Sequence, residues 1–132
     1  MVYRKGTDKL LDWNIKQYDF NTVKESKVAD GYETTNVWKI DPCFNKIHSA
    51  VFPVELCKRV IQYYSFKGDL IFDPFGGSGT VGKTAKSLDR FFFLTEKNDT
   101  YFEYMQSKKS NEIFDKQPTK FLPINDFKKT II

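Results

Sequence analysis

Apolar residues in the middle of the chain recur with two different periods, and these periods predict alternating helices and strands. From Pro53 they return at helical spacing until about Gly68, which predicts a helix that begins at the proline. Residues 69–73 and 90–96 are short apolar runs typical of strands buried on both faces. We expect a helix over 80–88 between them, and a third helix at Thr100, which forms a capping box with Glu103.

The order strand, helix, strand at the centre of this pattern predicts a βαβ unit with a further helix on either side. Such a unit makes a parallel pair of strands joined by a right-handed crossover. The fold class is therefore expected to be α/β.

The flanking segments carry weaker signals. Residues 1–35 mix charges of both signs without a sustained period, so we expect an irregular lead-in or linker with a short helix near Lys9 to Ile15. Residues 35–41 resemble a short strand that Pro42 ends, and residues 119–126 resemble one more edge strand. The chain is thus divided into a lead-in over 1–35 and one domain over 36–132.

Composition is consistent with a single soluble domain. The chain has 132 residues, of which 40% are hydrophobic, and no stretch approaches the roughly 20 apolar residues of a membrane span. We therefore expect a cytoplasmic protein without a membrane partner. Cys43 and Cys57 lack metal-ligand spacing, so we expect no metal site and two reduced, buried thiols. The net charge of +4 is compatible with contact to a polyanion but does not require it.

The stretch FDPFGGSGTVGKT, residues 72–84, fits two different ligand-binding patterns. From Gly77 to Thr84 it matches the phosphate loop G-x-x-x-x-G-K-[ST], in which Lys83 would contact a nucleotide triphosphate. From Asp73 it is an acidic strand end, a glycine turn and a helix, an arrangement that holds adenosyl cofactors in many folds.

The charges beside the turn favour the adenosyl cofactor. Asp73 lies at the mouth of the turn, where it would repel phosphates, and no later apolar strand ends in the aspartate that binds Mg²⁺ in nucleotide triphosphatases. Glu96 follows Gly76 by 20 positions, the spacing of an acidic residue that binds a ribose diol. Asp73 suits a ligand with a positive end, and S-adenosylmethionine has an ammonium and a sulfonium. The sequence therefore predicts S-adenosylmethionine as the cofactor.

Several motifs occur in one order along residues 37–104: H-S-A-V-F-P-V-E-L at 48–56, D-P-F-G-G-S-G-T at 73–80, then Arg90, Glu96 and Tyr101. This order resembles the C-terminal, cofactor-binding part of the permuted (beta-type) DNA methyltransferases that modify the exocyclic amino group of adenine (N6) or cytosine (N4). The resemblance implies a partial Rossmann-like fold of S-adenosylmethionine-dependent methyltransferases, with parallel strands and flanking helices.

The resemblance also implies roles for individual residues. Asp73, Phe75, Gly77 and Gly79 would surround the methionine part of the cofactor, Glu96 would hold its ribose, and Lys83 would be a solvated helix residue. Segment 48–53 would pack over the other side of the cofactor. The implied cofactor-binding residues are His48, Phe52, Pro53, Asp73, Pro74, Phe75, Gly76, Gly77, Ser78, Gly79, Thr80 and Glu96.

The chain departs from this family at the catalytic motif. Transfer to an exocyclic amine needs acceptors for its hydrogens and an aromatic surface for the flipped base, which the family supplies with [D/N/S]-P-P-[Y/F/W]. The chain has no Pro-Pro dipeptide, and the nearest substitute is D-P-C-F at 41–44, with Asp41 and Phe44 as weak catalytic candidates. We therefore expect DNA contact only in the complete enzyme, with the catalytic strand on a complementary methyltransferase chain, or a homo-oligomer.

Two alternatives remain open from the sequence. The chain is a non-catalytic remnant or interaction module of the same fold, or it is a nucleotide-binding protein that uses Lys83 in a phosphate loop. The target base and the recognition sequence are not encoded in any motif of these residues.

Overall fold

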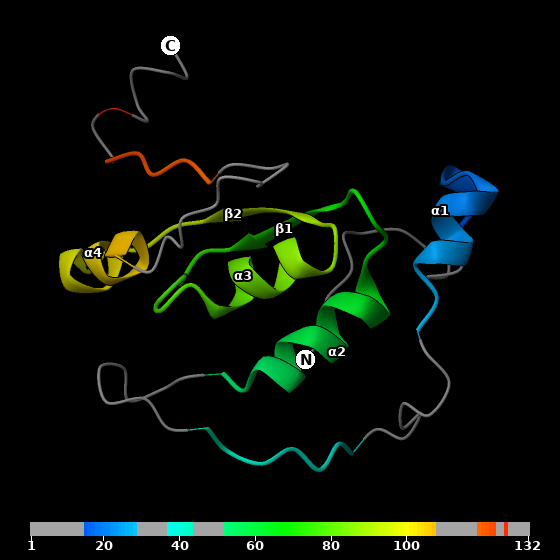
Figure 1. The fold of residues 1–132 in the computed structure, drawn as a ribbon, viewed down its shortest axis with the longest axis horizontal. Coiled ribbons are helices and arrows are strands. Elements are labelled where there is room, and N and C mark those ends of the chain that lie inside the picture. The colour runs from blue at the N-terminus through cyan, green and yellow to red at the C-terminus, as the bar shows by residue number, and fades with distance from the viewer. Residues whose placement is uncertain (1–14, 29–36, 44–51, 108–118, 124–125, 127–132) are drawn as a thin grey trace, which may run out of the picture.

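The structure, a computed structural model, describes residues 15–28, 37–43, 52–107, 119–123 and 126. The elements follow in the order α1 (Phe20–Glu25), α2 (Val54–Tyr64), β1 (Leu70–Asp73), α3 (Thr80–Ser87), β2 (Phe91–Leu94) and α4 (Asp99–Ser107) (Figure 1). The predicted order from α2 to α4 and the α/β class are confirmed. Helix α2 begins one residue after Pro53, which is its N-cap, and it ends at Tyr64, short of the expected Gly68.

Strands β1 and β2 form a parallel pair in which Leu70 is opposite Phe91 and Asp73 is opposite Leu94. Helix α3 connects them and packs against both strands. The helix lies very close to β2, because a Cβ placed on Gly82 would be 2.8 Å from Leu94 Cδ1 and 2.9 Å from Phe92 Cδ2. A glycine at this helical position therefore allows the close packing that holds the βαβ unit together.

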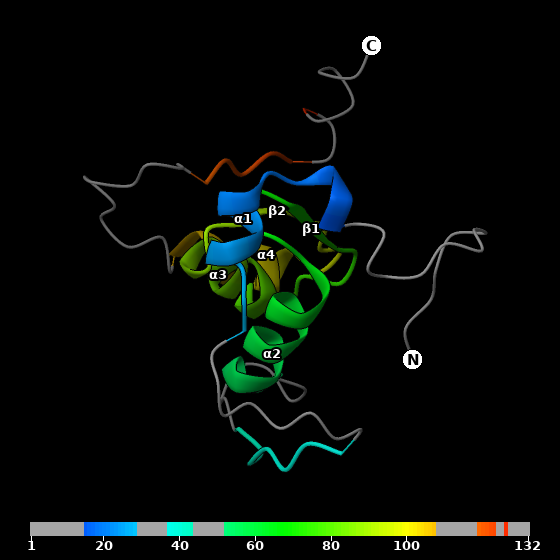
Figure 2. The same cartoon turned by 90° about the vertical axis from the view of Figure 1, so that its right-hand side faces the viewer.

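Helices α2 and α3 pack against each other and lie on the same side of the sheet in both views (Figures 1 and 2). Cys57, Ile61 and Ala85 are buried in this layer, whereas alternate residues of both strands are exposed on the other face. The expectation that both strands would be buried on both faces is therefore wrong for the described residues. A continuous apolar run indicates a strand buried on both faces only where other elements cover both faces of the sheet.

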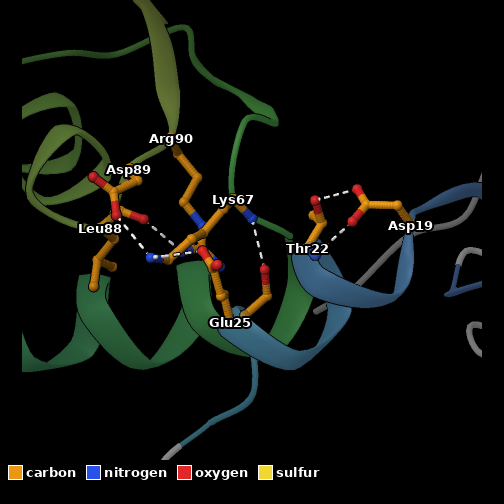
Figure 3. Close-up of polar contacts among 8 residues, drawn as sticks. Asp19, Thr22, Glu25, Lys67, Leu88, Asp89 and Arg90 are labelled. Atoms are coloured by element: carbon orange, nitrogen blue, oxygen red, sulfur yellow. Dashed lines mark hydrogen bonds and ion pairs between the residues drawn. The ribbon is translucent and has the colours of Figure 1, made fainter. Parts of the chain in front are cut away.

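Helix α1 was not expected from the sequence, and it contacts the corner between α2 and β1. Its N-cap Asp19 accepts the backbone N–H of Thr22, and Ser26 Oγ, which follows the helix, accepts the backbone N–H of Lys67 at 2.9 Å (Figure 3). The Lys67 ammonium lies 2.9 Å from Asp89 Oδ2 and 3.6 Å from Glu25 Oε2. Residues 15–28 are thus attached to the amino-terminal end of the sheet. The expected helix near Lys9 lies outside the described residues, apart from Ile15, which begins a short 3-10 turn.

A buried arginine ties the start of β2 to the end of α2. Arg90 is 2% exposed, and its guanidinium donates to the carbonyl oxygen of Ser65 at 2.8 Å, to Ser65 Oγ at 3.3 Å and to the carbonyl oxygen of Leu88. These three acceptors compensate the removal of the guanidinium from water. Burial nevertheless lowers the pKa of Arg90.

Other local expectations are wrong. Residues 37–41 form no strand, and neither do residues 119–123. Thr100 lies inside α4, and the side chain of Asn98 accepts the N–H of Tyr101 at the start of the helix instead. Cys57 is buried as expected, but Cys43 is exposed. None of the described helices has the length and apolar character needed to cross a membrane.

Candidate cofactor-binding site

The turn between β1 and α3 is built on backbone conformations that favour glycine. Gly77 and Gly79 have φ angles of 52° and 78°, in the left-handed region. The N–H of Gly79 donates to the carbonyl oxygen of Gly76 at 2.8 Å, which closes the turn. A Cβ on Gly79 would also lie 3.1 Å from Cγ and Sδ of Met105 in α4. The glycines therefore allow a tight turn directly under α4.

Thr95, the residue that follows β2, holds this turn by three hydrogen bonds. Its N–H donates to the carbonyl oxygen of Asp73 at 3.0 Å, and its carbonyl oxygen accepts the N–H of Gly76 at 2.8 Å. Its hydroxyl donates to the carbonyl oxygen of Pro74 at 2.8 Å. The turn is thus an extension of the sheet, with a position fixed by the neighbouring strand. Sequence reasoning assigned no role to Thr95, although its place directly before Glu96 at a strand end was visible.

Glu96 is brought to the glycine turn as the spacing predicted. Its Oε2 accepts the N–H of Gly77 at 2.7 Å, and its Oε1 accepts the N–H of Asn98 at 2.8 Å. A carboxylate has about four acceptor positions, so each oxygen keeps a position for a further donor. Two hydroxyls of a ribose are donors of the required kind and spacing.

Asp73 ends β1 on the other side of the same turn. It is half-buried, and its Oδ1 accepts the N–H of Phe75 at 2.9 Å. Burial raises the pKa of the nearby Cys57 thiol, and the negative charge of Asp73 raises it further. The two carboxylates therefore border one glycine turn, a setting that favours a ligand with a positive end over a polyphosphate.

The start of α2 lies near the glycine turn and the first residues of α3. Val54 lines a cavity of about 250 Å³ together with Ser78, Thr80 and Tyr104, and the exposed Lys83 lies at the same cavity. The preceding Phe52 is exposed and Pro53 is half-buried. The start of α2 is thus a neighbour of the glycine turn through Val54. The predicted site residues Phe52 and Pro53 do not line this cavity, and His48 lies outside the described residues.

The weak catalytic candidates are not brought to the turn in the described part of the chain. Asp41 is exposed in the irregular segment 37–43, which lies beyond α2 from the sheet in both views (Figures 1 and 2). The segment packs on α2 through Trp38, whose ring stacks on Tyr63 at 5.5 Å and faces the Arg59 guanidinium at 5.8 Å. Phe44 lies outside the described residues.

Comparison with known proteins gives consistent matches. A family model of the N6/N4 type, described as DNA methylase, matches residues 1–109. The chain is 34% identical over 97 residues to the type II methyltransferase M.Cfr9I of Citrobacter freundii. The matched residues make up 72% of this chain and 32% of that protein. It is 35% identical over 118 residues to the orphan methyltransferase M.BamHII of Bacillus amyloliquefaciens. The matched residues make up 83% of this chain and 43% of that protein. The chain therefore spans less than half the length of these curated relatives.

Solved structures share the fold. A protein of Thermus thermophilus described as a DNA modification methylase superposes with a TM-score of 0.57 at 24% identity, over 86% of this chain and 42% of that one. Its complex with S-adenosyl-L-methionine superposes with a TM-score of 0.55 at 23% identity, over 82% of this chain and 38% of that one. These superpositions show that the chain shares the fold of part of these larger proteins.

Proposed function

Because the chain belongs to the N6/N4 family of DNA methylases, we propose that it is the S-adenosylmethionine-binding part of a site-specific DNA methyltransferase that acts on an exocyclic amino group of adenine (N6) or cytosine (N4). The observation that carries the proposal is the position of two carboxylates on one glycine turn. Asp73 begins the turn, and Glu96 accepts the N–H of Gly77 within it at 2.7 Å.

The residues of the turn suit each part of this cofactor. Asp73 attracts the ammonium and the sulfonium, which are both positive, and Glu96 has free acceptor positions for the ribose hydroxyls. Gly77 and Gly79 leave the backbone without side chains where the methionine part would lie. When bound, the cofactor supplies the methyl group, and these residues of the chain bind it and orient it. The complex of the Thermus thermophilus relative with S-adenosyl-L-methionine supports this assignment.

Methyl transfer needs further groups that residues 1–132 lack in sequence. The target nitrogen must give up a proton to an acceptor, and the flipped base needs an aromatic surface. No Pro-Pro-aromatic motif is present, and the segment 37–43, to which the exposed Asp41 belongs, lies on the far side of α2 from the sheet (Figures 1 and 2). In this proposal the catalytic strand and the DNA-recognition region come from a complementary chain.

Two other functions receive less support. A phosphate loop would place Lys83 against a triphosphate, but Asp73 and Glu96 would repel that ligand across the same turn. A remnant without cofactor affinity would leave no reason for Glu96 to retain free acceptor positions beside the turn.

Calorimetry with the purified chain tests the cofactor assignment. We expect S-adenosylmethionine and S-adenosylhomocysteine to bind and Mg-ATP not to bind. Lys83→Ala should leave both affinities unchanged, because Lys83 is an exposed helix residue in this assignment. Binding of Mg-ATP alone, lost in Lys83→Ala, would replace the methylase function with the phosphate loop.

The need for a complementary chain has a separate test. The chain alone should transfer no methyl group from radiolabelled S-adenosylmethionine to DNA that contains both adenine and cytosine. Methylation by the isolated chain would contradict this part of the proposal, and Asp41→Ala would then be the variant to assay.

A further inference from the structure

The pairing of β1 with β2 is regular up to Asp73 and irregular immediately after it. Along a regular parallel ladder, one residue bonds to two residues of the neighbouring strand that lie two positions apart. Thr95 follows β2, and its N–H donates to the carbonyl oxygen of Asp73 at 3.0 Å. A regular ladder would bring the N–H of Phe75 to the carbonyl oxygen of Thr95, but the N–H of Gly76 donates there at 2.8 Å. Pro74 and Phe75, the bulge, thus occupy the space of one ladder residue.

Two backbone groups of the bulge bond to side chains instead of to the ladder. The N–H of Phe75 donates to Asp73 Oδ1 at 2.9 Å. The carbonyl oxygen of Pro74 accepts the hydroxyl of Thr95 at 2.8 Å. A proline has no N–H, so its carbonyl oxygen is the one backbone group that it offers for hydrogen bonding. The hydroxyl of Thr95 holds Pro74 through this group.

The hydroxyl bond differs from the other two bonds between Thr95 and the turn in its dependence on residue type. The bonds to Asp73 and Gly76 use the backbone of Thr95, so they form with almost any residue at this position. The bond to Pro74 needs a hydroxyl, which threonine and serine provide and valine does not. The identity of residue 95 therefore affects the bulge more directly than it affects the ladder.

The bulge lies between the two carboxylates that the proposed function assigns to the cofactor. Asp73 precedes it and bonds to Phe75 within it, so the direction of the Asp73 carboxylate depends on the shape of the bulge. Bulges next to active sites commonly re-aim a side chain in this way. We propose that Thr95 is a positioning residue, whose hydroxyl fixes the bulge and thereby sets the Asp73 carboxylate relative to Glu96 for the binding of S-adenosylmethionine. This inference rests on the proposed function, because it takes the ligand from it.

A preference of threonine for strands is the simpler explanation of residue 95, and valine separates the two explanations. Valine has the same branched Cβ and a similar preference for strands, but it replaces the hydroxyl with a methyl group. Thr95 and Pro74 are both exposed, so their hydrogen bond competes with water and contributes little to the stability of the whole fold. Thr95→Val should therefore change the turn while the fold stays intact.

Amide hydrogen exchange of the full chain without ligand, measured by NMR, tests the hold on the bulge. In Thr95→Val the N–H of Gly76 should exchange at least about threefold faster than in the wild type, because the bulge opens more often. The N–H of Phe91 is the internal control, since it donates to the carbonyl oxygen of Asp69 at the other end of β2 at 2.9 Å. Its exchange should stay unchanged, whereas a loss of global stability would accelerate both amides.

Calorimetry with S-adenosylhomocysteine tests the effect on the site. Thr95→Val should raise the dissociation constant about threefold to tenfold, the range expected for the loss of one hydrogen bond. Thr95→Ser keeps the hydroxyl and should stay within about twofold of the wild type. The matched control is Thr100→Val, which makes the same substitution at an exposed position of α4 and should change the affinity by less than about twofold.

Several results would overturn the inference. These are equal affinities of the wild type and Thr95→Val, a Thr95→Ser chain that binds as weakly as Thr95→Val, and unchanged exchange of the Gly76 amide. Any of them, with S-adenosylhomocysteine still bound by the wild type, removes the positioning role and leaves the proposed function in place. A wild-type chain that does not bind S-adenosylhomocysteine removes the cofactor assignment and the positioning role together.

Discussion

The carboxylate of Glu96 accepts the backbone N–H of Gly77 at 2.7 Å, although 19 positions separate the two residues. This bond joins the end of β2 to the turn that follows β1. It means that the acidic residue expected to bind ribose also holds the glycine turn in place. Under the proposed function, Glu96 would therefore bind the cofactor and also help to hold the turn, together with Thr95.

Glu96→Gln should weaken the binding of S-adenosylhomocysteine. The amide loses the negative charge and replaces one acceptor oxygen with a donor, so one charge-assisted contact to ribose is lost. We expect a loss of about 1.5–3 kcal/mol, which is roughly 10- to 150-fold in the dissociation constant. Calorimetry on the free chain measures it.

The matched control for Glu96→Gln is Glu103→Gln, which makes the same change on an exposed position of α4. It should leave the dissociation constant unchanged. Equal affinities for the wild type and Glu96→Gln would remove Glu96 from the cofactor site.

Gly82→Ala should destabilise the fold even though alanine is the better helix former. The new methyl group would lie 2.8 Å from Leu94 Cδ1 and 2.9 Å from Phe92 Cδ2, so α3 must shift away from β2. Overpacking costs about 1–3 kcal/mol and the gain in helix propensity is about 1 kcal/mol. Urea unfolding should therefore show a net loss of up to about 2 kcal/mol.

Lys83→Ala serves as the control for Gly82→Ala, because it places an alanine at the next, exposed position of the same helix. Its free energy of unfolding should stay within about 0.5 kcal/mol of the wild type. A Gly82→Ala chain more stable than the wild type would show that α3 does not pack closely on β2.

Tyr18 should lose its proton only at high pH. Its hydroxyl donates to Asp69 Oδ1 at 2.7 Å, and its ring stacks on Phe66 at 4.2 Å. The hydrogen bond to Asp69, followed by burial and the charge of Asp69, raises the pKa of Tyr18 from 10.0 to about 12. Because the folded pKa is the higher one, the contribution of this contact to stability is complete below about pH 10 and is lost as the pH rises through about 12.

The absorbance of tyrosinate should therefore show a late titration step in the wild type that is absent in Tyr18→Phe. The difference in stability between the two proteins should shrink over the same pH range. Tyr64→Phe should keep the late step, because the Tyr18–Asp69 contact remains. A Tyr18→Phe chain with an unchanged titration curve would contradict the contact.

The two cysteines should differ in reactivity. Cys43 is exposed, whereas Cys57 is buried in α2, and burial raises the pKa of its thiol. Since the thiolate is the reactive form, iodoacetamide should modify Cys43 at least about tenfold faster than Cys57. Mass spectrometry of peptides from the native chain measures both rates, and equal rates would contradict the burial of α2.

Sequence reasoning located the elements that local patterns define. The helix after Pro53, the strands at 69–73 and 90–96 and the glycine turn each carry their signal within a few residues. The pairing of Glu96 with the turn followed from a spacing of 20 positions. Its role as an acceptor for the N–H of Gly77 did not, because a hydrogen bond to the backbone across 19 positions is not marked by the residue type of the donor.

Features that depend on distant partners were missed. Helix α1 has only six residues, and its docking through Ser26, Tyr18 and Glu25 involves residues about 40 to 50 positions away. The expected strand at 35–41 has apolar residues of the right kind, but Trp38 packs on α2 instead of pairing in the sheet. The apolar strands predicted burial on both faces, yet the described residues supply a layer for only one.

The parallel pairing of β1 with β2 has a consequence for how the protein is made. The unit from Leu70 to Leu94 joins strands that are near in sequence through one helix, so the chain closes only a short loop to form it, at modest entropic cost. Loop-closure entropy therefore favours this pairing over contacts between more distant segments. We expect the unit from β1 to β2 to form before residues 15–28 dock on it across about 40 to 50 positions.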